Sequence, residues 1–206
     1  MVYDIQPNIK GLIFDLDGTL ANTMPYHFIG WKLASKKFGV DMDQTFLRRL
    51  NGSAGKIIAS ELIKEFRLEN VTIEELIEEK LYQFNKIQHE VKPIEPVVNI
   101  VKKYHGTLPM AVGTGGHRKA VERTLEITGL RQYFDIIITS NDVENFKPHP
   151  ETFLKCAELM KVNPEFIQVF EDGNLGLEAA RTAGMIATDV RSWYNSDWEN
   201  NQHRIT

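Results

Sequence analysis

Short runs of apolar residues alternate with stretches of helical periodicity along the second half of the chain. The apolar runs have the length of buried strands and occupy residues 11–14, 109–112, 135–139, 167–170 and 186–190. The helical patterns lie between the later runs, at residues 96–104, 117–128, 150–161 and 174–183. Strands that are apolar throughout and alternate with helices indicate a parallel sheet with helices on both faces, so the pattern predicts an α/β fold.

The middle of the chain, residues 22–88, has helical patterns and no convincing strand. A Thr-x-Pro start signal predicts a first helix, residues 54–66 a second, and the capping box that starts at Thr72 a third. We therefore predict a Rossmann-like parallel sheet core formed by residues 1–21 and 89–206. The helical segment between these two parts is predicted to be an inserted cap subdomain.

The composition excludes several classes of protein. The 206 residues include 24 Lys and Arg against 28 Asp and Glu, so the chain lacks the basic excess of an electrostatic nucleic-acid binder. No 18-residue apolar stretch is present, and we expect no membrane partner. Cys156 is the only cysteine, which favours a cytoplasmic location and leaves oxygen or imidazole ligands for any metal. The net charge of −4 fits a monomer.

Polar residues follow the predicted strands at the point where each strand ends. They are Asp15, Asp17, Thr114, Glu171 and Asp172; Gly115 follows Thr114, and Lys147 lies near the predicted strand at residues 135–139. An Asp or Thr in such a place is often a helix N-cap, and a lone Lys is usually a solvated charge, so the argument depends on the whole set. Ligands bind at the carboxyl ends of parallel strands, and crowded carboxylates repel each other unless a cation lies among them. Hard oxygen ligands suit Mg²⁺, while a lysine and a hydroxyl on a glycine-rich turn suit a phosphoryl group.

The segment Asp15-Leu16-Asp17-Gly18-Thr19 resembles the first motif of the haloacid dehalogenase (HAD) superfamily. Thr114, Lys147 and the pair Glu171-Asp172 resemble the second, third and fourth motifs, in the same order. The resemblance covers essentially the whole chain, including the cap. Residues 147–150 and 170–172 are similar to the β-phosphoglucomutase-like branch. Residues 50–53 and 109–115 are similar to small bacterial phosphatases that act on fructose 1-phosphate and 6-phosphogluconate.

This resemblance implies a role for each core residue. Asp15 would be the nucleophile that forms an aspartyl-phosphate, and Asp17 the general acid and then the general base. Thr114, Gly115 and Lys147 would hold the oxygens of the transferring phosphoryl group.

The resemblance also implies a magnesium site. The carboxylates of Asp15 and Asp172 and the backbone carbonyl of Asp17 would bind Mg²⁺, with Glu171 as a further ligand or as a partner of a ligand.

The cap would select the leaving group. Thr23, His27 and Lys80 match cap and hinge positions that sense substrate in the mutase branch, and Asn51 and Gly52 match a substrate-specificity loop. These matches have ordinary alternatives. The histidine would also fit a simple packing role, and Glu78 and Glu79 suggest that Lys80 lies on a solvated charged face.

The favoured function is hydrolysis of small sugar phosphates, and the main rival is a β-phosphoglucomutase. A mutase holds a second phosphate in its cap, normally with an arginine, and the residue at that position here is Gly55, next to Lys56. A dehalogenase needs no second carboxylate in its first motif, whereas Asp17 is present. A non-enzymatic phospho-acceptor module lacks a large cap, so residues 22–88 argue against that function.

Three further features have no predicted chemistry. Trp31 and Cys156 lie on apolar helix faces and are predicted to be packing residues. The segment from Ser192 onward carries Trp193 and Tyr194 among polar residues, and we expect it only to cover part of the surface of the core.

Overall fold

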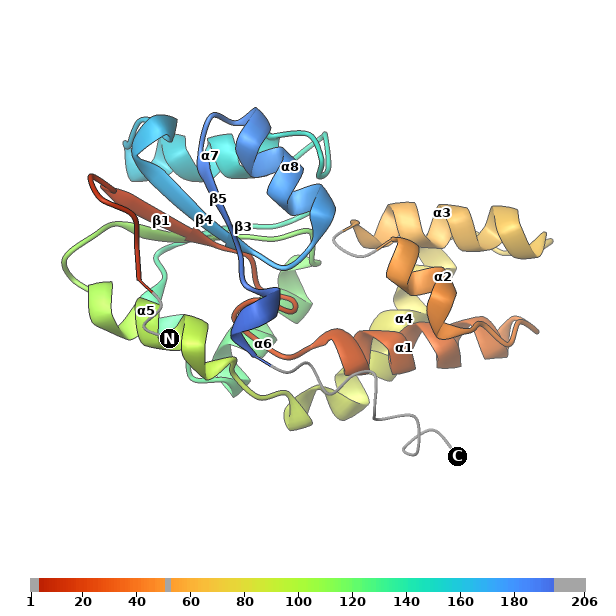
Figure 1. Cartoon of the computed structure of the whole chain (residues 1–206). Coiled ribbons are helices and arrows are strands. Elements are labelled where there is room, and N and C mark those ends of the chain that lie inside the picture. Colours follow the sequence, from red (N-terminus) through yellow and green to blue (C-terminus); the bar gives the residue numbers. More distant parts are fainter. Residues whose placement is uncertain (1–3, 51–52, 195–206) are drawn as a thin grey trace.

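The computed structural model describes residues 4–50 and 53–194. Within this part of the chain, five parallel strands form one sheet in the order β3-β2-β1-β4-β5 (Figure 1). The strands are β1 (Gly11–Phe14), β2 (Met110–Gly113), β3 (Ile136–Ile138), β4 (Ile167–Glu171) and β5 (Ile186–Asp189). Each begins and ends within two residues of an apolar run in the sequence, so the predicted parallel α/β sheet is confirmed.

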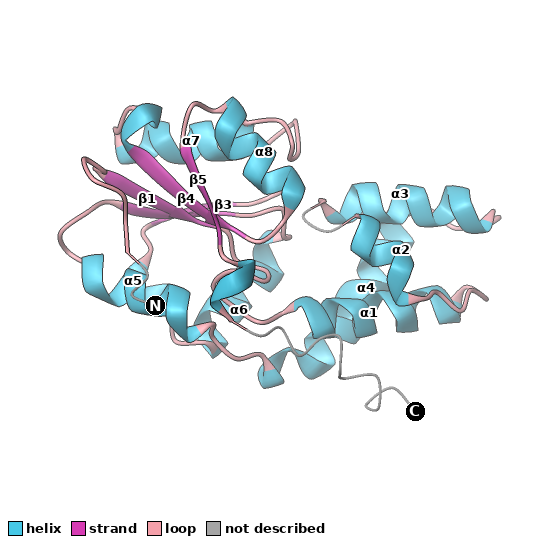
Figure 2. Cartoon of the chain, viewed as in Figure 1, coloured by secondary structure: helices cyan, strands magenta, loops and turns pink. Residues whose placement is uncertain are grey.

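Helices cover both faces of the sheet (Figure 2). Helices α5 (Glu95–Tyr104) and α6 (Arg118–Ile127) lie on one face, and α7 (Glu151–Met160) and α8 (Asn174–Thr182) on the other. Leu12 and Phe14 of β1 pack in the cluster under α5 and α6, while Ile13 packs with α7 and α8. Successive side chains of a strand point to opposite faces, so a run that is apolar throughout is buried on both. Short 3₁₀ turns, η1 (Gln88–Glu90), η2 (Arg131–Tyr133), η3 (Pro164–Phe166) and η4 (Arg191–Trp193), connect these elements.

Four helices between β1 and α5 lie to one side of the sheet (Figure 1). They are α1 (Met24–Lys37), α2 (Gln44–Arg49), α3 (Gly55–Phe66) and α4 (Ile73–Ile87). The capping box predicted at Thr72 is present. The helix α2 was not predicted, because a helix of six residues is too short to show a period. These helices enclose an apolar cluster of their own, which includes Phe28, Trp31 and Leu62.

The chain enters and leaves this helical segment at neighbouring positions. Ala21 pairs with Pro93 in an isolated bridge, and the Asn22 amide donates to the Lys92 carbonyl at 2.9 Å. The two connections between the helical segment and the rest of the chain therefore lie side by side.

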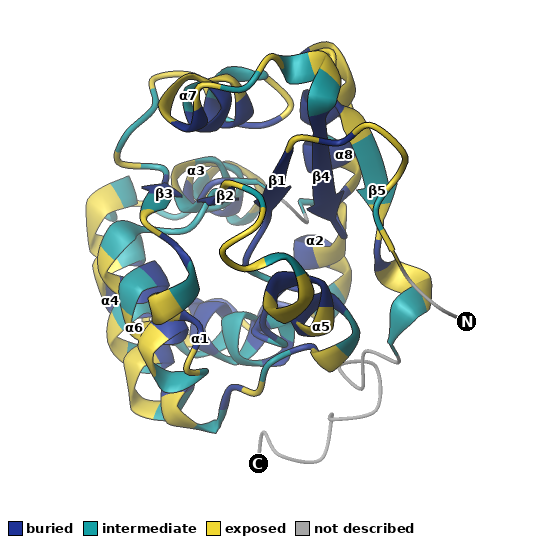
Figure 3. Ribbon diagram, turned by 90° about the vertical axis from the view of Figure 1, so that its left-hand side faces the viewer, coloured by how far each residue is buried: buried dark blue, intermediate teal, exposed yellow. Residues whose placement is uncertain are grey.

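Strands β1 and β4 are buried, whereas the helices around them carry exposed residues (Figure 3). Cys156 and Trp31 are buried among apolar residues, as predicted. Lys80 and Glu79 are both buried, which excludes the alternative that Lys80 lies on a solvated charged face. Glu79 accepts a hydrogen bond from Lys37, a contact between α4 and α1 that the sequence pattern of α4 alone does not contain. No helix among the described residues has the length and apolar character needed to cross a membrane.

Candidate active site

One lysine lies between two carboxylates at the centre of the sheet's carboxyl edge. Asp15 follows β1, Glu171 ends β4, and Lys147 lies in the loop between β3 and α7. The Nζ atom of Lys147 donates to Oδ1 of Asp15 and to Oε2 of Glu171, at 2.7 Å in each case. All three side chains are buried. Strands β1 and β4 are neighbours in the sheet, so residues far apart in the sequence meet at its edge.

The charges of this group do not balance. Burial and the neighbouring Glu171 carboxylate raise the pKa of Asp15 to about 8, against the attraction of Lys147. Burial also opposes the charge on Lys147, but Asp15 and Glu171 outweigh it and raise the pKa of the lysine above its ordinary value. Lys147 is therefore protonated at neutral pH. Because Lys147 faces two carboxyl groups, both cannot stay ionised without a further cation, and burial favours the neutral form of Asp15.

A third buried carboxylate, that of Asp172, increases this imbalance. Ligand oxygens of Asp15, Glu171 and Asp172 all lie within 4.8 Å of one another. The Thr19 hydroxyl donates to Oδ1 of Asp172 at 3.4 Å. Buried carboxylates this close are stable together when a cation neutralises them, and an all-oxygen donor set suits a hard divalent ion. The residues therefore fit a divalent metal. The Asp17 carboxylate lies outside this group.

Two glycines allow the carboxylates to approach the backbone. Gly18 has a φ of +83°, and a Cβ atom on it would lie 2.3 Å from Oδ2 of Asp172. A Cβ atom on Gly176, in the first turn of α8, would lie 1.9 Å from Oε2 of Glu171. Gly18 was expected to turn the chain. Gly176 was not identified from the sequence, where its only signal is a glycine early in a helix that follows the acidic pair.

A second polar chain connects Asp17 to the helical segment. The Nζ atom of Lys80, on α4, lies 2.8 Å from Nδ1 of His27, on α1, and Nε2 of the same ring lies 2.9 Å from Oδ1 of Asp17. An ammonium group can only donate, so Nδ1 accepts and Nε2–H donates to the carboxylate. The imidazole is then neutral, in agreement with burial and the charge of Lys80, which lower the pKa of His27.

The same contacts fix the charge of Asp17. Burial raises the pKa of Asp17, but the hydrogen bond that His27 donates, a smaller contribution from Thr23 and the charge of Lys80 outweigh burial and lower the pKa below its ordinary value. Asp17 is consequently ionised at neutral pH, whereas burial favours the neutral, protonated form of Asp15. Two carboxyl groups with pKa values pushed apart are a frequent arrangement at acid–base sites.

Thr114 lies where β2 runs into the glycine-rich turn before α6. Its side chain is buried, and its Oγ1 accepts a hydrogen bond from the Gly116 amide at 3.1 Å. The hydroxyl proton can therefore be donated to another group. Gly115 lies beside Thr114 in the same turn. Hydroxyl and amide donors before a helix are suited to an anion.

A cavity of about 920 Å³ lies between these strand ends and the helices α1–α4. Its walls include Asp15, Asp17, His27, Lys80, Thr114 and Gly115. Four of the predicted site residues lie behind the wall and not in it. Lys147, Glu171 and Asp172 are grouped around Asp15, and Thr23 lies beside Asp17. The opposite wall is largely apolar, and the Trp31 ring contributes to it as well as to the core of the helical segment. Asn51 and Gly52 lie outside the described residues.

The sheet, the inserted helices and the four strand-end motifs together define a haloacid dehalogenase-like hydrolase, and residues 12–190 match the model of that family. The chain belongs to this family. It is 41% identical to the fructose-1-phosphate phosphatase YqaB of Escherichia coli, over 88% of this chain and 96% of the relative. It is 32% identical to the phosphorylated carbohydrates phosphatase of Thermotoga maritima, over 86% and 82% of the two chains. The crystal structure of β-phosphoglucomutase from Clostridium difficile matches with a TM-score of 0.77 at 28% identity, over 88% and 84% of the two chains.

Proposed function

We propose that this protein is a magnesium-dependent phosphatase that hydrolyses small sugar phosphates. The observation that carries the proposal is the arrangement of Asp15 and Asp17 on one cavity, with a buried lysine behind the first and a histidine held against the second. The names of the two phosphatase relatives support a phosphorylated carbohydrate as the substrate class.

In the proposed reaction Asp15 is the nucleophile, in the ionised form that a bound divalent cation beside it would favour. One carboxylate oxygen attacks phosphorus, the bond from phosphorus to the sugar oxygen breaks, and an aspartyl-phosphate forms. Asp17 gives a proton to the departing sugar oxygen and then takes one from the water that attacks the aspartyl-phosphate. This second attack releases phosphate and restores Asp15. Because Asp17 is ionised in the free protein, its proton must be gained when the substrate binds.

Fixed donors hold the phosphoryl oxygens during both steps. Thr114 has its hydroxyl proton available, and Gly115 lies beside it. Lys147 keeps Asp15 oriented through the 2.7 Å contact and stabilises negative charge near phosphorus. We assign the magnesium ligands to the carboxylates of Asp15 and Asp172 and the carbonyl of Asp17, with Glu171 supporting them. A bound Mg²⁺ would neutralise charge on the phosphate.

We further propose that residues 22–88 form a cap that selects the sugar, over a core formed by residues 1–21 and 89–206. Thr23, His27 and Lys80 then sense the leaving group from the cap side, and Asn51 and Gly52 contribute a specificity loop. A monomeric state and a cytoplasmic location stay predictions, and size-exclusion chromatography with light scattering tests the first.

Gly55 favours the phosphatase over the mutase. A Cβ atom built on Gly55 would have only the Trp31 ring near it, at 3.9 Å, so this part of the cavity wall has room that no cationic side chain fills from this position. A mutase needs a firm site for a second phosphate, whereas a phosphatase releases its sugar. Lys56 also lines the cavity and is the residue that would have to serve a mutase instead.

The test is phosphate release from fructose 1-phosphate, 6-phosphogluconate and β-glucose 1-phosphate, with and without Mg²⁺, while glucose 6-phosphate is assayed in parallel. Asp15→Asn is the inactive control. Magnesium-dependent phosphate release that disappears in the control supports the proposal and identifies the preferred sugar. Glucose 6-phosphate formed from β-glucose 1-phosphate with little free phosphate would make the protein a mutase and overturn the argument from Gly55.

A further inference from the structure

Tyr194, one of the aromatic residues that follow β5, contacts the loop that carries Asp15 and Asp17. The hydroxyl group of Tyr194 donates a hydrogen bond to the backbone carbonyl of Gly18 at 2.6 Å. Burial, together with the carboxylates of Asp172 and Asp15, raises the pKa of Tyr194, so the hydroxyl stays protonated and acts as the donor. This bond joins residues 176 positions apart in the chain. From the amino-acid pattern alone, this segment is expected only to cover part of the surface of the core.

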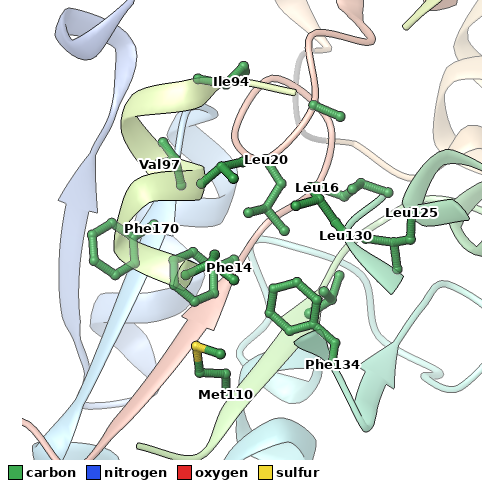
Figure 4. Close-up of a cluster of buried hydrophobic side chains, with 14 of the residues drawn as sticks. Phe14, Leu16, Leu20, Ile94, Val97, Met110, Leu125, Leu130, Phe134 and Phe170 are labelled. Carbon is green, nitrogen blue, oxygen red and sulfur yellow. The ribbon is translucent and has the colours of Figure 1, made fainter. Parts of the chain in front are cut away.

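Aromatic rings pack between the η4 turn and the strands β4 and β1, and this packing supports the hydrogen bond. Trp193, in η4, packs edge-on against Phe170 with ring centroids 5.8 Å apart, and Phe170 stacks on Phe14 at 4.9 Å. Figure 4 shows Phe14 and Phe170 side by side in the cluster beneath the strands. Phe14 directly precedes Asp15, and Phe170 directly precedes Glu171. The η4 turn is thereby fixed to the two strands that present the carboxylates.

Gly18 is a sensitive point in the catalytic loop. It has a positive φ of +83°, and its α-carbon lies so close to Asp172 that no side chain fits between them. Its peptide nitrogen is joined to the carbonyl carbon of Asp17. A rotation of the chain at Gly18 would therefore change both the direction of the Asp17 carbonyl and the distance between this loop and Asp172.

We propose that Tyr194 is a positioning residue, whose hydroxyl group holds the Gly18 carbonyl and so fixes the Asp17–Gly18 turn against Asp172. The inference rests on the proposed function for its kinetic consequence. Its consequence for the acidic group does not, since Asp15, Glu171 and Asp172 are gathered in the structure whatever reaction they serve.

The test removes the hydroxyl alone. Tyr194→Phe keeps the ring and its packing, and Tyr104→Phe is the matched control, because its hydroxyl donates to Asp4 at the exposed end of α5, away from the cavity. Three quantities are measured for wild type and both variants. They are kcat and KM for one sugar phosphate, the dissociation constant of Mn²⁺ from the substrate-free protein by electron paramagnetic resonance, and hydrogen exchange of the peptide that spans residues 15–22.

A neutral hydrogen bond of this kind corresponds to a change of about two- to tenfold. We expect Tyr194→Phe to lower kcat by that factor with KM nearly unchanged, to weaken Mn²⁺ binding by a similar factor, and to speed exchange in residues 15–22. Tyr104→Phe should leave all three at wild-type values. Circular dichroism and the thermal midpoint check that both variants are folded.

The outcomes separate the two proposals. If the wild-type protein hydrolyses no sugar phosphate, the proposed function fails, while Mn²⁺ binding and exchange still test Tyr194. If the wild type is active but Tyr194→Phe matches it in kcat, Mn²⁺ binding and exchange, the positioning role is refuted. Equal changes in Tyr194→Phe and Tyr104→Phe would also refute it, because they would reflect a general loss of stability.

Discussion

Lys80 is a buried charge that the folded protein retains at a cost. Its Nζ atom lies 4.8 Å from the centroid of the Phe84 ring and 5.7 Å from that of Trp31, and its hydrogen-bond partner is Nδ1 of His27. Burial lowers the pKa of Lys80 from 10.5 to about 8, although the charge of Asp17 opposes the shift. A shift of that size means that keeping Lys80 protonated in the folded state at neutral pH costs about 3 kcal/mol.

We therefore expect Lys80→Met to make the protein more stable and less active. Met has a similar length and packs well against the surrounding aromatic rings. The variant no longer has to bury a charge, but it loses the hydrogen bond to His27, which offsets about 1 kcal/mol of the stabilisation. The net increase in the free energy of unfolding should be about 2 kcal/mol at pH 7. Turnover should fall roughly tenfold or more, because His27 loses the donor that fixes its tautomer and Asp17 loses a nearby positive charge.

The difference in stability between Lys80→Met and the wild type should depend on pH in one defined direction. Between pH 8 and 10.5 the unfolded chain binds a proton at Lys80 that the folded protein does not, so the stability of the wild type rises with pH in this window. The advantage of Lys80→Met should be complete below pH 8 and disappear as the pH approaches 10.5. Urea unfolding of both proteins from pH 6 to pH 10 measures this difference.

Lys56→Met is the matched control. Lys56 also lines the cavity but is exposed, so its replacement should change stability by less than about 0.5 kcal/mol at any pH. If Lys80→Met is less stable than the wild type at pH 7, or if its advantage does not shrink toward pH 10, Lys80 is not the costly buried charge described above.

Three shorter predictions concern the carboxylate group. Asp15→Asn should lower turnover by roughly 10⁴-fold or more with little loss of stability, as measured by phosphate release and thermal unfolding. Gly176→Ala should destabilise the protein by about 1–3 kcal/mol in urea, because its Cβ would collide with Glu171, while Gly55→Ala should not. Lys147→Met should lower the free energy of unfolding by about 3–5 kcal/mol at pH 7, measured in urea, since it leaves buried carboxylates unpaired.

The strands, most helices and the centre of the site could be predicted, because they depend on the local pattern of apolar residues and on the rule that parallel strands end at one edge of the sheet. An apolar run predicts a strand wherever it lies, and parallel strands bring the residues that follow them to one edge. Asp15 and Lys147 are 132 positions apart, yet both were expected at that edge, where they form an ion pair at 2.7 Å. The short helix α2 falls below the length at which a helical period can be recognised.

Residues whose role needed the structure lie where two elements pack together. Glu78, Glu79 and Lys80 form a charged run on one helix, which is typical of a solvated face. The second and third of these are buried only because α4 packs against α1, which provides Lys37 for the glutamate and His27 for the lysine. A one-dimensional pattern contains no information about which polar partner a neighbouring helix will provide.

The contact between Tyr194 and Gly18 shows the same limit more strongly. A tyrosine among polar residues predicts surface, and the ring is indeed only partly buried. Its hydroxyl nevertheless reaches a backbone carbonyl, an acceptor that every residue carries and that no sequence motif marks. Side-chain roles that end on backbone atoms are therefore invisible in the sequence of either partner. They follow only from the order β1-β4-β5 in the sheet, which brings the segment after β5 behind the loop that follows β1.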